Sequence, residues 1–186
     1  MSHDGSLSES NERDLALRIG HLGLHLPGQV LRLDLYRLVC YFQTSEYLAN
    51  LSDGGDFCPW QGLREFQEPE IMRIVLQTAV AVRFIGAGHA DELRARREWL
   101  EDAVGKLYKT VNNAAAEPLP LREACNKIIH ARNIVLDSNE SGNPYTHFIK
   151  PKIFCYDDFQ QKTGWKAEID VLPFVEVCDA LMTQFS

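Results

Sequence analysis

Hydrophobic residues recur at the spacing of one helix face through most of the first 136 positions of the chain. The first such face consists of Leu31, Leu35, Leu38, Val39 and Phe42. It predicts a helix from about 30 to 50, which the Ser-Asp-Gly-Gly run at 52–55 ends. A second helix is predicted to begin at Pro69, because proline suits a first helical turn, and to end at the glycines of 86–88.

Two further helices are predicted between 91 and 136. The third has an apolar stripe made by Leu93, Leu100, Val104, Leu107 and Val111. It is predicted to start near Asp91 and to stop before Pro118 and Pro120. The fourth follows directly, and its buried side is made by Leu121, Ala124, Cys125 and Ile128. The polar loop at 137–144 ends it.

The hydrophobic period then changes from 3.6 to 2. The residues that alternate with polar ones are Trp165, Ala167, Ile169 and Val171. This alternation predicts a strand, with 149–156 as its antiparallel partner. Pro173 opens a last predicted helix, whose apolar face packs back on the bundle.

Together these patterns predict a mainly α protein. It consists of a helical bundle of about four long helices over 30–136, a C-terminal antiparallel β-hairpin over 147–172 and a closing helix over 173–185. A length of 186 residues suits one domain. The polar start of the chain predicts a disordered leader at 1–14, which leaves 15–186 as a single helical domain.

Composition narrows the function classes. With 45% hydrophobic and 24% charged residues the chain has the make-up of a globular protein. Its net charge of -7 repels phosphate backbones, so generic DNA binding along a broad basic face is not expected, whereas a small local site for RNA is compatible with it. The apolar stretch 71–88 carries Arg73, Gln77 and Arg83, which favours a buried helix over a membrane span. Five widely spaced cysteines without a Cys-x-x-Cys pair predict reduced thiols and a cytoplasmic location.

A polar row on the fourth predicted helix is the main candidate for chemistry. At about 100° per residue, Arg122, Asn126, His130 and Asn133 fall within an arc of roughly 80° beside the apolar stripe. A neutral imidazole can move a proton in either direction near physiological pH, and a guanidinium matches phosphate oxygens. The row therefore borders the core and carries groups suited to phosphate chemistry.

The segment 121–133 resembles the HEPN family, all-α domains that include RNA-cleaving toxins and defence proteins. In their motif an Arg is followed by Asn, Asp or His and, after a short spacer, by His; Asn126-x-x-x-His130 matches the second half. The resemblance extends over about 30–136. It implies that the His acts on the ribose 2′-hydroxyl or the leaving oxygen, that the Arg steadies the phosphate without a metal, and that two chains pair to form one cleft.

The chain departs from this motif at one position. Cys125 stands where the family has its Arg. Arg122, one turn earlier on the side of His130, or Arg132, two turns beyond Cys125, could supply the cation. The candidate catalytic residues are therefore His130, Asn126, Arg122 and Arg132.

Three function classes remain open from the sequence. The first is a homodimeric HEPN-like protein of the toxin or defence type. It would be either a metal-independent ribonuclease or a non-cleaving relative, and its partner would be RNA or a protein. The second is a non-enzymatic homodimeric interaction module, in which Asn126 and His130 form surface contacts. The third is a metal-binding protein, with His21, His25, Cys58 and His89 as ligands. His21 and His25 have the spacing of ligands on a helix, but the nearby glycines and Pro27 disfavour a helix there. Neither a metal nor a cofactor is therefore expected.

Overall fold

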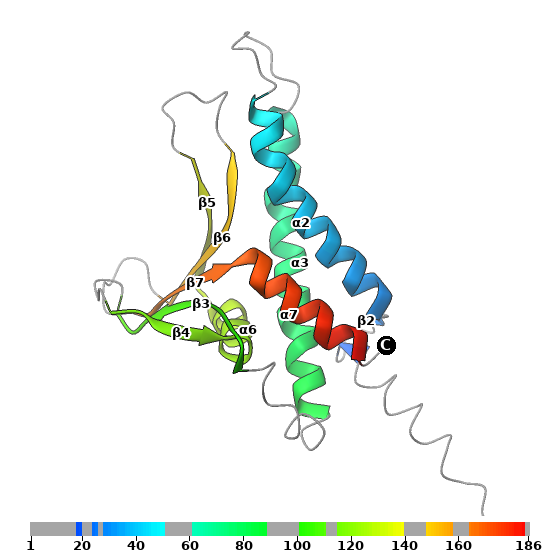
Figure 1. The fold of residues 1–186 in the computed structure, drawn as a ribbon, viewed down its shortest axis with the longest axis vertical. Helices are drawn as coiled ribbons and strands as arrows, with labels where there is room; N and C mark the ends of the chain where they lie inside the picture. The colour runs from blue at the N-terminus through cyan, green and yellow to red at the C-terminus, as the bar shows by residue number, and fades with distance from the viewer. Residues whose placement is uncertain are drawn as a thin grey trace, which may run out of the picture.

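An antiparallel sheet with helices packed on one of its faces forms the main body of the structure (Figure 1). The computed structural model describes residues 18–19, 24–25, 28–50, 61–88, 101–110, 115–139, 148–157 and 164–184. In chain order the elements are β1 (Arg18–Ile19), β2 (Leu24–His25), α2 (Gly28–Asn50), α3 (Gln61–Gly88), β3 (Ala103–Tyr108), β4 (Glu117–Pro120), α6 (Leu121–His130), β5 (Asn133–Ser138), β6 (Ile149–Tyr156), β7 (Lys166–Asp170) and α7 (Val171–Gln184).

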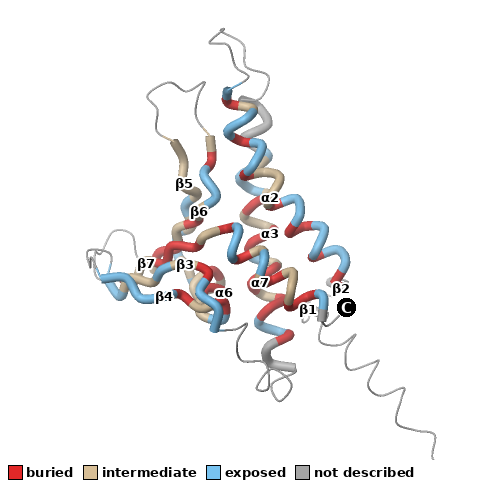
Figure 2. Tube along the Cα trace, in the orientation of Figure 1, coloured by how far each residue is buried: buried red, intermediate tan, exposed pale blue. Residues whose placement is uncertain are grey.

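The main sheet has five strands in the order β4-β3-β7-β6-β5, and every neighbouring pair is antiparallel. β7 lies in the centre and is largely buried (Figure 2). Gly105 of β3 pairs with Ile169 of β7, and a side chain at 105 would collide with the backbone carbonyl of Glu168. Glycine is therefore needed where these two strands approach each other.

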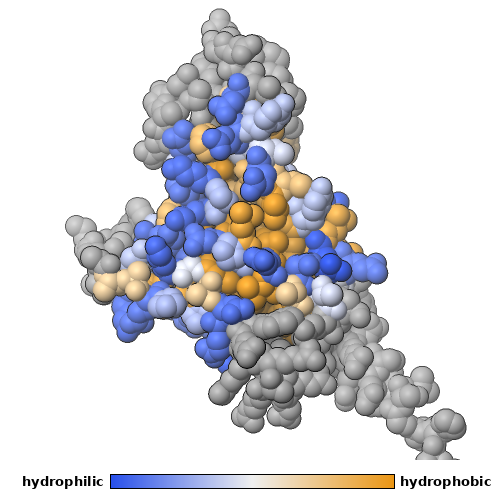
Figure 3. Space-filling model, viewed as in Figure 1, coloured by the Kyte–Doolittle hydropathy of each residue, from blue (hydrophilic) through white to orange (hydrophobic). Residues whose placement is uncertain are grey.

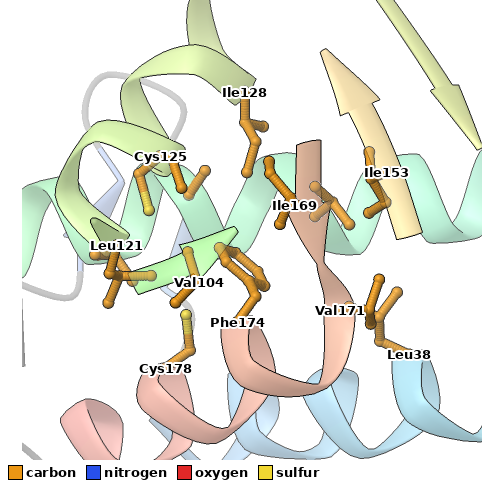
Figure 4. Packing of buried hydrophobic residues seen from close by; sticks show 14 of the residues in the cluster. Leu38, Val104, Leu121, Cys125, Ile128, Ile153, Ile169, Val171, Phe174 and Cys178 are labelled. Atoms are coloured by element: carbon orange, nitrogen blue, oxygen red, sulfur yellow. The ribbon is translucent and has the colours of Figure 1, made fainter. Parts of the chain in front are cut away.

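The hydrophobic core lies between the sheet and its helices. Alternate residues of β6 and β7, such as Ile153 and Ile169, are fully buried because successive side chains of a strand point to opposite faces. Figure 4 shows residues of the sheet, α6 and α7 meeting there, among them Cys125, Ile128, Ile153, Ile169, Phe174 and Cys178. Burying each of the larger side chains stabilises the fold by about 1.5–3 kcal/mol before the cost of ordering the chain.

A buried carboxylate links α2 to α3. Asp34 is 2% exposed and accepts hydrogen bonds from Arg37 at 3.0 Å and from Arg73 of α3 at 3.1 Å. Arg73 also donates to Glu70 and to Gln77. A charge taken out of water needs such partners, so these bonds hold the two helices in register.

The five-stranded sheet shows that the prediction of a mainly α protein, built as a bundle of about four long helices with a single β-hairpin, is wrong. Within the predicted third helix, 103–108 form β3; the part before 101 lies outside the described residues. The predicted fourth helix ends at His130, because Ala131 is extended and 133–138 form β5. β3 and β5 extend the predicted hairpin on either side, and β4 lies beyond β3.

Other elements agree with the pattern of the sequence. The helix predicted at about 30–50 is α2, and the one ending at 86–88 is α3, although α3 begins at Gln61 and contains Pro69 in its interior. The strands predicted at 149–156 and around 165–171 are present and pair with each other. The leader predicted at 1–14 falls outside the described residues.

The surface varies across the face drawn in Figure 3. Hydrophobic residues gather around α7, where Leu172 is exposed and Val175 is partly buried, whereas the strands are covered mostly by hydrophilic residues. In the described part of the chain, no helix combines the length and the apolar character needed to cross a membrane.

Candidate functional site

The polar row predicted on the fourth helix is divided between two elements. Arg122, Asn126 and His130 follow one another at four-residue spacing along α6, which keeps them on one side of it. Asn133 and Arg132 come after the helix has ended, at the start of β5. The helical geometry on which the role of Arg132 was predicted is therefore absent.

Asn126 is held on both sides by its own chain. Its Oδ1 accepts a hydrogen bond from Nη1 of Arg83 on α3, and its Nδ2 donates to Glu123 at 3.2 Å. Glu123 also pairs with Lys127 at 3.2 Å, and the Lys127 ammonium lies 4.3 Å from the centre of the Trp165 ring. These contacts connect α3, α6 and the start of β7, so the amide of Asn126 links elements of the fold.

Arg83 is a partner of the candidate residue Asn126 that could not be predicted from the sequence. It lies 43 residues from Asn126 along the chain, and no motif relates the two positions. The cation that binds Asn126 is thus Arg83, rather than Arg122 or Arg132.

Cys125 cannot take the part of the motif's arginine or of a nucleophile. It is fully buried in the core, and burial raises the pKa of its thiol to about 12. The thiol is therefore neutral at physiological pH, and a neutral buried thiol is a poor nucleophile and no phosphate ligand.

His130 and Arg132 both reach the surface. His130 is exposed as the last residue of α6. The side chain of Arg132 is 71% exposed and lies 4.0 Å from Asp157, while its backbone nitrogen donates to Tyr156 at 2.9 Å. Arg122 is also exposed.

A second group of polar and aromatic residues lies on the face of the sheet opposite to the core, here called the outer face. It comprises Lys106 and Tyr108 of β3, Lys166, Glu168 and Asp170 of β7, and Lys152 and Phe154 of β6. In register, Lys106 and Phe154 flank Glu168, and Tyr108 flanks Lys166. Ala167 and Ile169, between the β7 members, are buried, so the alternation of the strand brings these side chains together on the other face.

Lys166 lies between two aromatic rings. Its ammonium is 4.6 Å from the centre of the Phe154 ring and 5.1 Å from that of Tyr108. Both distances fall within the range of a cation–π contact. The two rings therefore sit on either side of the central strand with a cation between them.

Glu168 is the buried anion of the outer face. It is 8% exposed and accepts a hydrogen bond from Lys152 at 2.5 Å. Burial alone would raise the pKa of Glu168, but the bond from Lys152 and the charges of Lys166 and Lys106 outweigh it, so the pKa lies below its ordinary value. The same contact raises the pKa of Lys152. Glu168 is thus ionised, and lysines surround it.

The cations of the outer face outnumber its anions. Lys106, Lys152 and Lys166 stand against Glu168 and Asp170, and Lys152 is bound to both of these carboxylates. Lys106 is exposed and forms no ion pair with any residue that the structure describes. Among the described residues, the outer face therefore carries one more positive than negative charge, beside two aromatic rings.

Half of this arrangement could be predicted from the sequence. Lys166, Glu168 and Asp170 stand on the polar side of the alternating strand. Lys106 and Tyr108, however, fall in the predicted third helix, so the sequence does not predict that they lie beside that strand.

A metal site receives no support from the described residues. Among them no three His, Cys, Asp or Glu side chains are gathered closely enough to hold a metal ion. The side chains of His21, His25, Cys58 and His89 lie outside the described part. Comparison of the chain with known protein families, with curated proteins and with solved structures gave no match.

Proposed function

We propose that this protein binds RNA through the outer face of its sheet and does not cleave it. The observation that carries the proposal is the Lys166 ammonium between the Tyr108 and Phe154 rings, with exposed Lys106 on the neighbouring strand. Lysines attract phosphates, and aromatic rings on a sheet stack with bases. The two kinds of group occur here side by side.

The acidic charge of the whole chain limits where such binding can occur. A net charge of -7 repels a polyanion from most of the surface. The outer face is locally positive, because its three lysines, Lys106, Lys152 and Lys166, outnumber its two carboxylates among the described residues. RNA is thus expected on this face and weakly or not at all elsewhere.

Binding without cleavage agrees with the state of the motif on α6. Its arginine position holds the buried Cys125, and the amide of Asn126 is occupied by Arg83 and Glu123. A general acid or base needs a second group that stabilises charge in the transition state. Arg122 lies eight residues before His130, about 12 Å along α6, and Arg132 lies near Asp157 after the helix has ended.

Two charge reversals test the proposal against the site predicted from the sequence. Lys106→Glu changes the outer face, and Arg122→Glu makes the same change in charge on α6. With a labelled oligouridine in fluorescence anisotropy, Lys106→Glu should weaken binding about tenfold and Arg122→Glu less than about twofold. Equal losses, or a larger loss with Arg122→Glu, would contradict the proposal.

A ribonuclease centred on His130 is the second candidate. It is favoured by the exposure of His130 at the end of α6, with exposed Arg132 two positions further on. In that case His130→Ala should abolish cleavage of RNA while the circular dichroism spectrum stays unchanged. Cleavage by the wild type that survives this substitution would remove His130 from the candidates, and no cleavage by the wild type favours the binding protein.

Self-association is the expectation of the alternative class, a homodimeric interaction module. Its support is the exposed apolar surface around α7, including Leu172. Light scattering of the wild type and of Leu172→Lys would detect a dimer and its loss.

A cytoplasmic location is part of the proposal. It is supported by the free thiols of Cys125, Cys155 and Cys178, which are buried in the core.

A further inference from the structure

We infer that the outer face selects single-stranded RNA over duplex RNA by stacking unpaired bases on Tyr108 and Phe154. The inference rests on the proposed function and names the substrate class of the same site. It follows from the spacing of the two rings, from the cation that now lies between them and from the position of Lys106.

The two rings are spaced for neighbouring bases of one strand. Tyr108 and Phe154 belong to the strands on either side of β7, and adjacent strands lie about 4.8 Å apart. Because both ring centres lie close to the same ammonium of Lys166, they are at most about 10 Å apart. Two splayed nucleotides of a single strand can cover such a distance.

Lys166 can exchange one partner for another when a base arrives. Its ammonium now contacts both rings, and a cation–π contact near the surface is weaker than the stacking of a base on the same ring. A base that stacks on Phe154 or Tyr108 would displace the ammonium toward the phosphate of that nucleotide. The rings and the lysine would then each hold a different part of the RNA.

Duplex RNA cannot make the same contacts. Its bases are stacked inside the helix, and its deep major groove does not admit side chains. Its phosphates and 2′-hydroxyls would reach the outer face, where Lys106 is the exposed cation without an ion pair among the described residues. A purely electrostatic ligand such as polyphosphate would be restricted in the same way.

Substitutions at Phe154 separate stacking from charge. Phe154→Leu keeps an apolar side chain of similar length without the ring, and Phe154→Tyr keeps the ring. Labelled oligouridine of about 20 nucleotides, a duplex RNA of equal length and unlabelled inorganic polyphosphate as competitor are the three probes. Circular dichroism and thermal melting establish that each variant is folded.

Single-stranded RNA should bind the wild type at least about tenfold more tightly than the duplex does. Phe154→Leu should weaken single-strand binding about tenfold, whereas Phe154→Tyr should stay within about twofold of the wild type. Polyphosphate should compete poorly at equal phosphate concentration. If Phe154→Leu does not fold, Tyr108→Leu against Tyr108→Phe gives the same comparison on β3.

The outcomes distinguish the failure of this inference from that of the proposed function. Equal binding of single strand and duplex, effective competition by polyphosphate, or unchanged affinity of a folded Phe154→Leu variant would overturn stacking. The proposed function would survive any of these results if Lys106→Glu still weakens binding. Failure of every RNA probe to bind the wild type would overturn both.

Discussion

Two buried carboxylates, Asp34 and Glu168, are held by cations in different ways. Asp34 is 2% exposed and Glu168 is 8% exposed. Between α2 and α3, Asp34 and Glu70 are matched by Arg37 and Arg73, so the charges balance. On the outer face, Glu168 and Asp170 are matched by Lys152, with Lys106 and Lys166 in addition.

This contrast in charge balance indicates which cluster stabilises the fold and which can bind a ligand. The guanidinium groups of Arg37 and Arg73 in the first cluster donate hydrogen bonds within the chain, to Asp34, Glu70 and Gln77. The ammonium of Lys166 faces aromatic rings, a contact that a base and a phosphate can replace. We therefore expect substitutions in the first cluster to change stability and those in the second to change binding.

Removing Asp34 should have the largest effect on stability. Asp34→Ala deletes two charged hydrogen bonds between Asp34 and the arginines, and the free energy of unfolding should fall by about 2–3 kcal/mol, measured by urea denaturation. RNA affinity of the folded variant should not change. Glu70→Ala is the matched control, because its pair with Arg73 is partly exposed and should contribute less than about 1 kcal/mol. A stable Asp34→Ala protein with weakened RNA binding would reverse the assignment of the two clusters.

Neutralising Glu168 should lower stability and strengthen binding at the same time. Glu168→Gln keeps the shape of the side chain but removes the charge that binds Lys152, and the partial exposure of Lys152 limits the loss of stability to about 1 kcal/mol. One more uncompensated positive charge on the outer face should raise RNA affinity about threefold. Weaker RNA binding by a folded Glu168→Gln protein would show that Glu168 itself takes part in recognition.

Acid should diminish the stabilising effect of Glu168. Its pKa in the folded protein is lower than its ordinary value, so the stability that it contributes is present above the ordinary pKa and is lost as the pH falls through the folded-state value. The difference in unfolding free energy between wild type and Glu168→Gln should therefore shrink as the pH falls from neutral into that acidic range. Denaturation curves at a series of pH values measure it, and a constant difference would contradict the ionised, lysine-bound state of Glu168.

Long elements with one clear period could be predicted from the sequence, and β3 could not. In β3 the register against β4 shifts between Ala103 and Lys106, as at a β-bulge. The shift leaves Val104 fully buried and Leu107 packed against the core, although they are three positions apart. Inward residues three apart have the spacing of a helix face, so the sequence pattern predicts a helix there.

β5 escaped prediction for a different reason. Ile134, Val135 and Leu136 form an unbroken apolar run, which does not show which period it follows. In the sheet Ile134 and Leu136 pack against the core while Val135 is exposed, so the period is 2. β5 also follows α6 after only two residues, and a short apolar run close behind a helix resembles its continuation.

The candidate sites depended on contacts between distant parts of the chain. Asn126 meets Arg83 from α3, and Lys166 meets Tyr108 and Phe154 from two other strands. A single sequence shows the alternation that directs Lys166 and Glu168 to one face, but it does not show which strands lie beside them. The outer face could therefore be found only once β3, β6 and β7 were placed next to one another.

Photocrosslinking tests most directly whether RNA lies on the outer face of the sheet. A 4-thiouridine oligonucleotide is irradiated with the wild-type protein, and crosslinked peptides are identified by mass spectrometry. Crosslinks should fall in the peptides that contain Tyr108 and Phe154 and should decrease with Lys106→Glu. Crosslinks confined to α6 around His130 would contradict the account and return the site to the helix.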